Sequence, residues 1–272
     1  MTILLIVAAL ILAGLLFAHF FYASRFTAIT DALVGQLLAS QSGPMPVASL
    51  PEIVRTFAIR NGGMAGGPLA VKMVQSAEMR MSPAAAFFHL DATQTTGSKT
   101  PGFVWQASGF MAKVLPIRIV DSFVAERGWL EARIAGSIPV ASACGPDIDK
   151  GEAMRFLAEL AWNPDAFFNM AGLAWRQIDD LTVEVTMQTN GGAARVRLLF
   201  DAAGDITGIE ADDRPQGTGK ASKPMRWIGR FSGYAQSGHY RWPRHGEIAW
   251  DRPEGEFVYW RGDILSVEPV HG

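Results

Sequence analysis

The spacing of hydrophobic and polar residues changes twice along this chain. A first run, residues 3–22, is apolar throughout and carries no charge. Over residues 26–60 apolar positions recur three or four apart, which predicts amphipathic helices. From Leu69 onward apolar and polar residues alternate, which predicts β-strands. We therefore expect three parts: a membrane anchor at 1–24, helices and a linker at 25–68, and a β domain at 69–272.

The apolar run fits a transmembrane helix better than its two alternatives. Twenty helical residues span about 30 Å, the thickness of the hydrocarbon core of a bilayer. A signal peptide has a basic start, a shorter apolar stretch and small residues at its cleavage site, and this run has none of these. A buried helix of a soluble protein would show a polar face. We predict a single-pass anchor surrounded by membrane lipid. The few flanking charges do not determine on which side of the membrane the rest of the chain lies.

Three amphipathic helices are predicted. The first covers residues 26–40 and stops at Gly43-Pro44. The second starts with the sequence Ser-Leu-Pro-Glu at 49–52, a capping box, and runs to about Arg60. The third interrupts the strands at 149–162.

The alternating part predicts an α+β fold with one large antiparallel sheet, because short links join consecutive strands. Three helices are too few to cover so large a flat sheet. A strongly curved, half-barrel-like sheet with helices on its concave side is the simplest solution, and its apolar interior would offer room for a hydrophobic ligand. The predicted strands are 69–82, 87–95, 102–112, 117–124, 129–138, 173–178, 182–189, 194–200, 206–212, 226–236, 238–250 and 255–267.

Glu78, His89 and Asp91 are the candidates for acid–base or metal chemistry. A hairpin centred on Pro83 would put Glu78 opposite His89, with Asp91 on the same strand face as His89. The alternative is a set of ion-paired surface residues. We expect no bound metal, because no histidine pair has a typical ligand spacing.

A second polar set has apolar neighbours. Asp121 is in step with hydrophobic residues of its strand, so it needs an arginine partner or marks a functional position. On the third helix Glu152, Arg155, Glu159 and Trp162 form one stripe. This stripe either faces solvent or faces the sheet and pairs with strand charges such as Arg80 or Arg133. Arg80, Asp121, Arg155, Glu159 and Trp162 are therefore candidates for a ligand-binding or structural cluster.

Aromatic residues are the third candidate group. The chain has eight tryptophans, and several lie in its last third with tyrosines. They either fill the core of a curved sheet or form a rim that contacts a ligand or membrane. The candidate rim residues are Trp105, Trp250, Tyr259 and Trp260.

Composition narrows the functional classes. Lysine and arginine number 24 against 26 aspartates and glutamates, and this balance argues against a nucleic-acid partner. The single cysteine, Cys144, forms no disulfide within the chain; it lies in the turn-like ASACGPD and is interpreted as incidental rather than catalytic. Phosphate loops, dinucleotide fingerprints and nucleophile elbows are absent from the sequence, so we expect no cofactor.

Four segments resemble a bacterial, membrane-associated family known only as a domain of unknown function. They are SAEMRM at 76–81, PGFVWQA at 101–107, MRFLAELAWNP at 154–164 and GEFVYWRGDI at 255–264. The likeness covers about Leu50 to Glu268, and members often carry an apolar amino-terminal segment. The resemblance implies a bacterial cell-membrane location and transfers no activity. The expected architecture is similar to the half-barrels of bacterial lipoprotein carriers, an analogy of fold alone.

Three functions are compatible with these features. The leading hypothesis is a membrane-anchored domain that binds a lipid or another hydrophobic small molecule inside the curved sheet. The second is a hydrolase that uses Glu78, His89 and Asp91. The third is a structural or assembly protein whose aromatic rim contacts another protein of the cell envelope.

Overall fold

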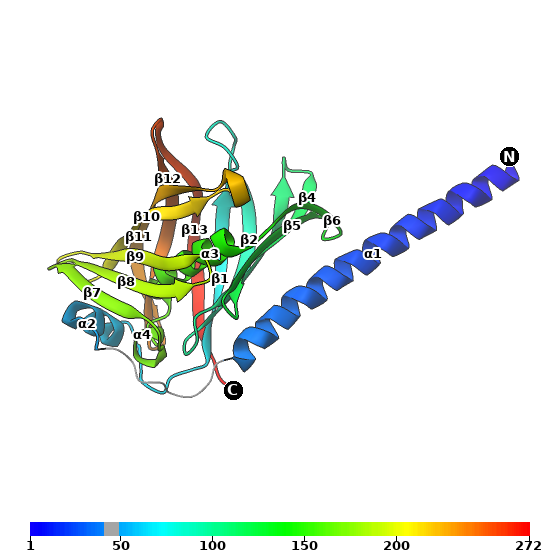
Figure 1. The fold of residues 1–272 in the computed structure, drawn as a ribbon. Coiled ribbons are helices and arrows are strands. Elements are labelled where there is room, and N and C mark those ends of the chain that lie inside the picture. The colour runs from blue at the N-terminus through cyan, green and yellow to red at the C-terminus, as the bar shows by residue number, and fades with distance from the viewer. Residues whose placement is uncertain (41–48) are drawn as a thin grey trace.

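A computed structural model describes residues 1–40 and 49–272 of the chain. It confirms the α+β fold: a long apolar helix followed by one large open antiparallel sheet and a few short helices (Figure 1). The helix stop expected at Gly43-Pro44 lies outside the described residues. The thirteen strands are β1 (Ala70–Met79), β2 (Phe88–Gly97), β3 (Phe103–Met111), β4 (Leu115–Val124), β5 (Arg127–Ile134), β6 (Ile138–Cys144), β7 (Ala174–Asp179), β8 (Thr182–Thr189), β9 (Gly192–Phe200), β10 (Ile206–Gln216), β11 (Lys223–Ser237), β12 (Tyr240–Arg252) and β13 (Gly255–Val270).

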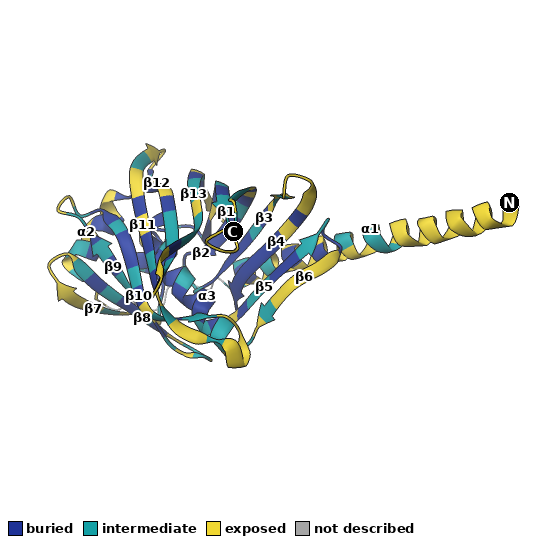
Figure 2. Ribbon diagram, turned by 90° about the horizontal axis from the view of Figure 1, so that it is seen from above, coloured by how far each residue is buried: buried dark blue, intermediate teal, exposed yellow. Residues whose placement is uncertain are grey.

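The sheet consists of two meanders joined where the first and last strands pair. The order runs β6 to β1, then β13 back to β7, and Ala70 pairs with Val270 at the junction. Every pair of neighbouring strands except β1 and β13 is also consecutive in sequence, so short turns suffice to build each meander. The sheet curls so that its inner face carries the buried side chains (Figure 2).

Helix α3 (Pro146–Ala158) lies across this inner face and continues into the 3₁₀ turn η1 (Glu159–Trp162). It contacts β4–β6 in one meander and β8–β10 in the other, so it bridges the two halves of the sheet (Figure 2). Helices α2 (Glu52–Arg60) and α4 (Ala166–Asn169) fill one end of the interior, where the rings of Phe57 and Phe167 meet edge to face at 5.9 Å. We call this the closed end.

Helix α1 (Thr2–Ala39) joins the expected anchor and the first amphipathic segment without a break. Its second half packs on the outer face of β3 and β4, where Phe26 and Leu37 are buried against Val104 and Val120. Its first half projects into solvent (Figure 1), and the helix is long and apolar enough to cross a membrane.

Three local predictions differ from the structure. The turn-like ASACGPD belongs in part to a thirteenth strand, β6, because its small residues show no alternation yet still pair with β5. Helix α3 begins at Pro146 rather than at 149. The capping box is wrong: Pro51 occupies the N-cap of α2, and no side chain caps it. A 3₁₀ turn, η2 (Gly219–Ala221), completes the elements.

Candidate functional site: a cavity between helix α3 and the curved sheet

A cavity of about 620 Å³ separates α3 from the inner face of the sheet. This volume lies in the range of pockets that hold small organic molecules, about 300–1,000 Å³. The cavity lining includes Arg80, Arg252 and Phe257, next to the β1–β2 and β12–β13 turns, which lie at one end of the sheet; we call this end the open end. The apolar lining of the cavity comes from both meanders and includes Met79, Trp105, Ile119, Leu130, Trp162, Trp227, Phe231, Ile248, Trp250, Phe257, Tyr259, Trp260 and Ile264.

All four candidate rim aromatics line this cavity rather than the outer surface. Trp105 is buried, and its indole N–H donates to Gln75 Oε1 at 2.8 Å. Trp250 and Tyr259 stack with ring centroids 5.9 Å apart. The hydroxyl of Tyr259 accepts hydrogen bonds from Arg214 and Trp227, each at 3.1 Å, so Trp105 and Tyr259 have their polar atoms partnered inside the protein and leave apolar ring surface toward the cavity.

The stripe on α3 and η1 faces the sheet, and its cation is the centre of a buried network. Arg155 donates to Asp121 Oδ2 on β4 at 2.7 Å, to Glu159 Oε1 at 2.8 Å and to Gln94 Oε1 at 3.2 Å. Its guanidinium also lies over the rings of Phe103 and Trp105, 4.7 and 5.3 Å from their centroids. Burial lowers the pKa of Arg155, but the surrounding carboxylates of Glu159, Asp121 and Glu152 raise it by more, so the guanidinium stays charged.

Glu152, one turn before Arg155, pairs with Arg214 of β10 and not with Arg80 or Arg133. Arg214 approaches Glu152 Oε1 to 3.4 Å and donates to the hydroxyl of Tyr259 at 3.1 Å. Burial, followed by the charge of Asp121, raises the pKa of Glu152 to about 8. Burial also raises the pKa of Asp121 despite its two arginine neighbours. This shift favours a protonated carboxyl over two ionised ones at this place in the cavity wall.

The open end carries two arginines without carboxylate partners. Arg80 and Arg252 both lie against the ring of Phe257, with guanidinium carbons 5.3 and 4.2 Å from its centroid. Arg80 donates to the backbone oxygen of Val258, whereas Nε of Arg252 is buried and has no hydrogen-bond partner. Over residues 1–40 and 49–272 neither arginine forms an ion pair. Two guanidiniums beside an apolar cavity make this rim suited to an anion.

Among the residues that sequence reasoning missed are Gln94, Arg214 and Arg252. Arg214 follows two aspartates that point away from the cavity, and a register shift between Ala211 and Arg214 turns its side chain inward. Such a bulge leaves no periodic signal. Gln94 lies on the inner face of β2, and its position two residues from Ala92 in an alternating strand could have identified it.

Glu78, His89 and Asp91 lie on the outer face of the sheet. Glu78 is the cross-strand partner of His89, as the hairpin predicted, and His89 Nε2 lies 3.1 Å from Asp91 Oδ1. Glu78 binds Arg261 at 2.7 Å instead of His89. Glu78 and His89 share a shallow groove of about 560 Å³ with His245 and Asp263, while Asp91 lines a separate hollow beside α1. Among the described residues no group of three or more His, Cys, Asp or Glu is placed to hold a metal ion.

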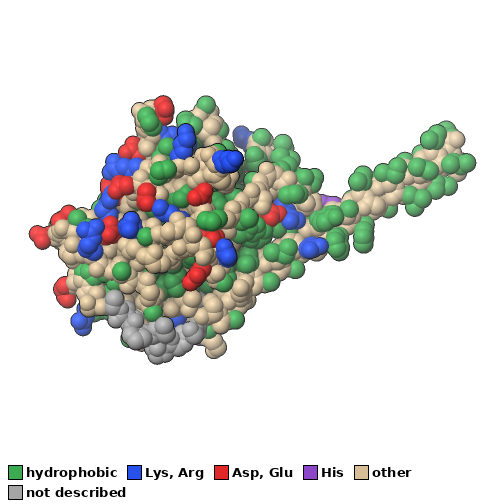
Figure 3. Space-filling view, viewed as in Figure 1, with side chains coloured by type: hydrophobic (Ala, Val, Ile, Leu, Met, Phe, Trp, Pro, Cys, Tyr) green, Lys and Arg blue, Asp and Glu red, His purple; other side chains and the backbone are tan. Residues whose placement is uncertain are grey.

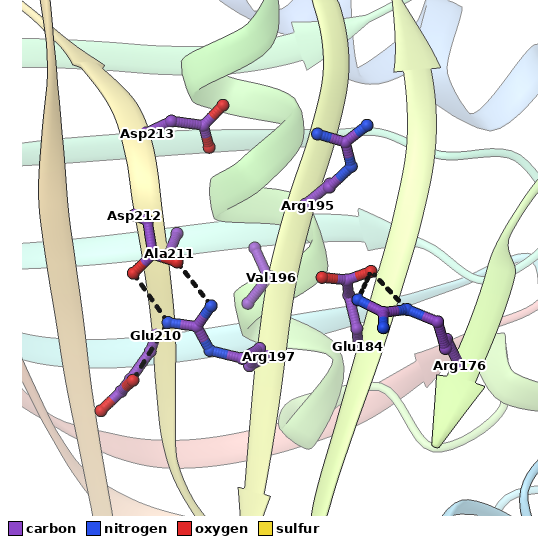
Figure 4. A pocket seen from close by; sticks show the side chains of 9 residues that line it. All are labelled: Arg176, Glu184, Arg195, Val196, Arg197, Glu210, Ala211, Asp212 and Asp213. Atoms are coloured by element: carbon purple, nitrogen blue, oxygen red, sulfur yellow. Dashed lines mark hydrogen bonds and ion pairs between the residues drawn. The ribbon is translucent and has the colours of Figure 1, made fainter. Parts of the chain in front are cut away.

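A second outer groove, of about 650 Å³, is lined by ion pairs (Figure 4). Arg197 binds Asp212 at 2.6 Å and Glu210 at 3.2 Å, and Arg176 binds Glu184 at 3.0 Å. These exposed pairs account for most of the strand arginines of this flank. Cys144 is exposed at the end of β6.

Comparison with known proteins places the chain in a family. None of the functionally curated proteins matches this sequence. Among solved structures, a LolA superfamily protein from Nitrosomonas europaea is 7% identical with a TM-score of 0.45, covering 80% of this chain and 94% of that one. A DUF1329 family protein from Desulfovibrio piger is also 7% identical, with a TM-score of 0.44, covering 80% and 90%. The model of a family described as a family of unknown function (DUF6544) matches residues 42–262. Because that match spans most of the chain, the protein belongs to the DUF6544 family.

Proposed function

We propose that the protein is a membrane-anchored carrier or receptor for an acidic amphiphile, whose apolar part occupies the cavity and whose anionic group meets Arg80 and Arg252. The observation that carries this proposal is a cavity of about 620 Å³ with aromatic lining, beside two arginines that have no ion-pair partner among the described residues. Helix α1 supplies the anchor, a single pass through a bacterial cell membrane.

The chemistry of the lining favours a lipid-like ligand over a small polar one. Apolar surface buried from water contributes about 25 cal/mol per Å², so a hydrocarbon chain gains most from these rings. The deep arginines already have carboxyl partners: Arg155 contacts Asp121 and Glu159, and Arg214 contacts Glu152. The buried Nε of Arg252 at the mouth is therefore the group with most to gain from an acidic partner.

Photolabelling of the full chain in phosphatidylcholine nanodiscs tests this proposal. The discs carry a trace of a photoactivatable fatty acid, a phosphatidylcholine with the same tail, or an alkylamine of the same length. We expect the fatty acid to label peptides that contain Trp105, Trp250 or Trp260, more strongly than the other two probes do. Labelling of α1 alone by all three probes would contradict the proposal.

Two tryptophan variants in β6 give the matched control. Ala143 lines the cavity, so Ala143→Trp should block labelling of the cavity peptides. Ser142 is the preceding residue and points to the opposite, exposed face, so Ser142→Trp should leave the labelling unchanged. Equal labelling in both variants would place the ligand elsewhere.

The hydrolase and envelope-assembly hypotheses stay predictions. Glu78 and His89 share an outer groove that is separate from the cavity. The rim aromatics face a cavity, which favours a ligand over a protein partner as the molecule they contact.

A further inference from the structure

The open end of the sheet is also the end from which α1 leaves the domain. Three turns of the first meander lie there, because the strands alternate in direction: β1–β2 (80–87), β3–β4 (112–114) and β5–β6 (135–137). His19 Nδ1 lies 2.8 Å from the hydroxyl of Ser137 in the last of these turns. At the other end of the docked segment, Leu37 packs beside Gly102. The residues before His19 therefore extend beyond the open end.

These three turns carry exposed apolar side chains and no acidic ones. Residues 81–90 and 134–146 contain no Asp, Glu, Lys or Arg, and residues 110–117 contain Lys113 alone. Val114 is 78% exposed and Met81 is 71% exposed, so neither side chain packs in the core. Exposed apolar residues gathered at one place mark a contact surface more often than scattered ones do. The other exposed members of this group are Phe110, Leu115, Ile138 and Val140.

Other turns have a different character. At the closed end, strand β7 finishes at Asp179 and the β7–β8 turn holds Asp180, while the β4–β5 turn holds Glu126. In Figure 3, hydrophobic side chains gather on the side from which α1 leaves, and most of the charged ones lie on the opposite flank. The apolar turns are thus a local feature of the first meander.

We propose that the three turns at 80–87, 112–114 and 135–137 rest in the interface of the bilayer that α1 crosses, so that the cavity opens toward the lipid. The proposal rests on the proposed function in one respect, that α1 spans a membrane. A helix of 38 residues is about 57 Å long, enough to cross a bilayer core of about 30 Å and still line the sheet. The hydrogen bond between His19 and Ser137 sets the depth, since it ties the turn to the helix near the end of the apolar run.

Such an arrangement would let an amphiphile pass between bilayer and cavity without crossing water. Lys113 at the tip of the β3–β4 turn suits the acidic lipid head groups of a bacterial membrane. Side chains such as Val114 would gain, in the interface, apolar contacts that the domain itself does not provide.

Depth measurements with spin labels test the arrangement. The full chain with Cys144→Ser receives single cysteines by Val114→Cys, Ile138→Cys or Leu181→Cys, and is reconstituted in vesicles of phosphatidylcholine and phosphatidylglycerol. Leu181 is the matched control, because it is exposed and lies in the β7–β8 turn at the closed end. For each label we compare collisions with oxygen and collisions with a water-soluble nickel chelate. The ratio of oxygen to nickel collisions should be at least several-fold higher for the labels at 114 and 138 than for the label at 181.

A fourth label, from Leu12→Cys in the apolar run, separates the two proposals. If the label at 12 is in lipid while those at 114 and 138 are as accessible to nickel as that at 181, the docking proposal is overturned and the anchor stands. If the label at 12 is itself in water, both the anchor and the docking proposal fail. Labelling of the cavity by the photoactivatable fatty acid is read separately and depends on neither result.

Discussion

Glu152 on α3 and Asp121 on β4 are neighbouring carboxyl groups in the wall of the cavity, and each has one buried oxygen without a hydrogen-bond partner in the described part of the chain. Those oxygens are Asp121 Oδ1 and Glu152 Oε2. A proton held between two such groups satisfies both, because a protonated carboxyl donates to an ionised one. Burial is the main cause of the raised pKa of both Glu152 and Asp121, and these raised pKa values favour a state in which the pair holds a proton.

The pair makes stability depend on pH in a defined direction. The pKa of Glu152 rises from 4.5 to about 8 on folding, so the folded chain binds more protons than the unfolded chain between these values. The contribution is fully present below pH 4.5 and is lost as the pH rises through about 8. We expect the urea midpoint of the full chain in detergent to fall from pH 5 to pH 9. In Glu152→Gln, which keeps a neutral donor, this slope should flatten; an unchanged slope would contradict the assignment.

Removing the central cation should cost more than removing an outer one. Arg155→Met leaves Asp121 and Glu159 buried without their partner, which we expect to lower the free energy of unfolding by about 3–5 kcal/mol. Arg176→Met is the control: Arg176 also pairs with a glutamate, but its side chain is 67% exposed, so the loss should stay below about 1 kcal/mol. Urea unfolding of both variants measures the difference, and losses of equal size would refute the buried network.

The mouth arginines should determine head-group preference. Arg252→Gln removes a charge that has no ion-pair partner among the described residues, so folding should be little affected. Binding of the fatty acid should weaken about tenfold relative to an uncharged alcohol of the same length, since hydrogen bonds to charged groups contribute about 1.5–3 kcal/mol. Arg226→Gln, on an exposed ion pair of the outer face, should leave the ratio unchanged. Competition of the fatty acid and of the alcohol against a fluorescent fatty acid gives the two affinities for each variant.

One glycine determines how closely the β8–β9 turn approaches α3. A Cβ at Gly191 would lie 2.0 Å from the backbone oxygen of Pro146, the first residue of that helix. Gly191→Ala should therefore destabilise the fold by about 1–3 kcal/mol, as overpacking does elsewhere. Gly35→Ala, in α1 where nothing lies within 4 Å of an added Cβ, should not destabilise it. Thermal unfolding followed by circular dichroism would distinguish these outcomes.

The sequence predicted the sheet well because alternation is a local signal. Seven side chains alternate inward in β8 and β9, among them Val183, Val185, Val196 and Leu198, and they could be identified without knowing their partners. Strand β6 could not be predicted in this way, because Ala141 and Ala143 alternate only with Ser142 and differ little from it in hydrophobicity. The continuity of α1 was also hidden, since nothing at Arg25 distinguishes one helix from two.

The site was harder to predict because its contacts are long-range. Asp121 was expected to need an arginine, but Arg155 and Arg214 reach it only once β4, β10 and α3 have assembled. The aromatic residues were identified by abundance alone, and only the curvature of the sheet decides that Trp105 and Trp260 face the same cavity. The bulge that turns Arg214 inward has no counterpart in the hydrophobic pattern.

The central claim is that the cavity holds an acidic amphiphile, and native mass spectrometry of the full chain tests it most directly. The chain is released from nanodiscs that contain phosphatidylcholine and a fatty acid. We predict one fatty acid retained per chain in the wild type and in Ser142→Trp, and none in Ala143→Trp. Wild-type chains that emerge without a bound amphiphile, or that keep it equally in Ala143→Trp, would contradict the account.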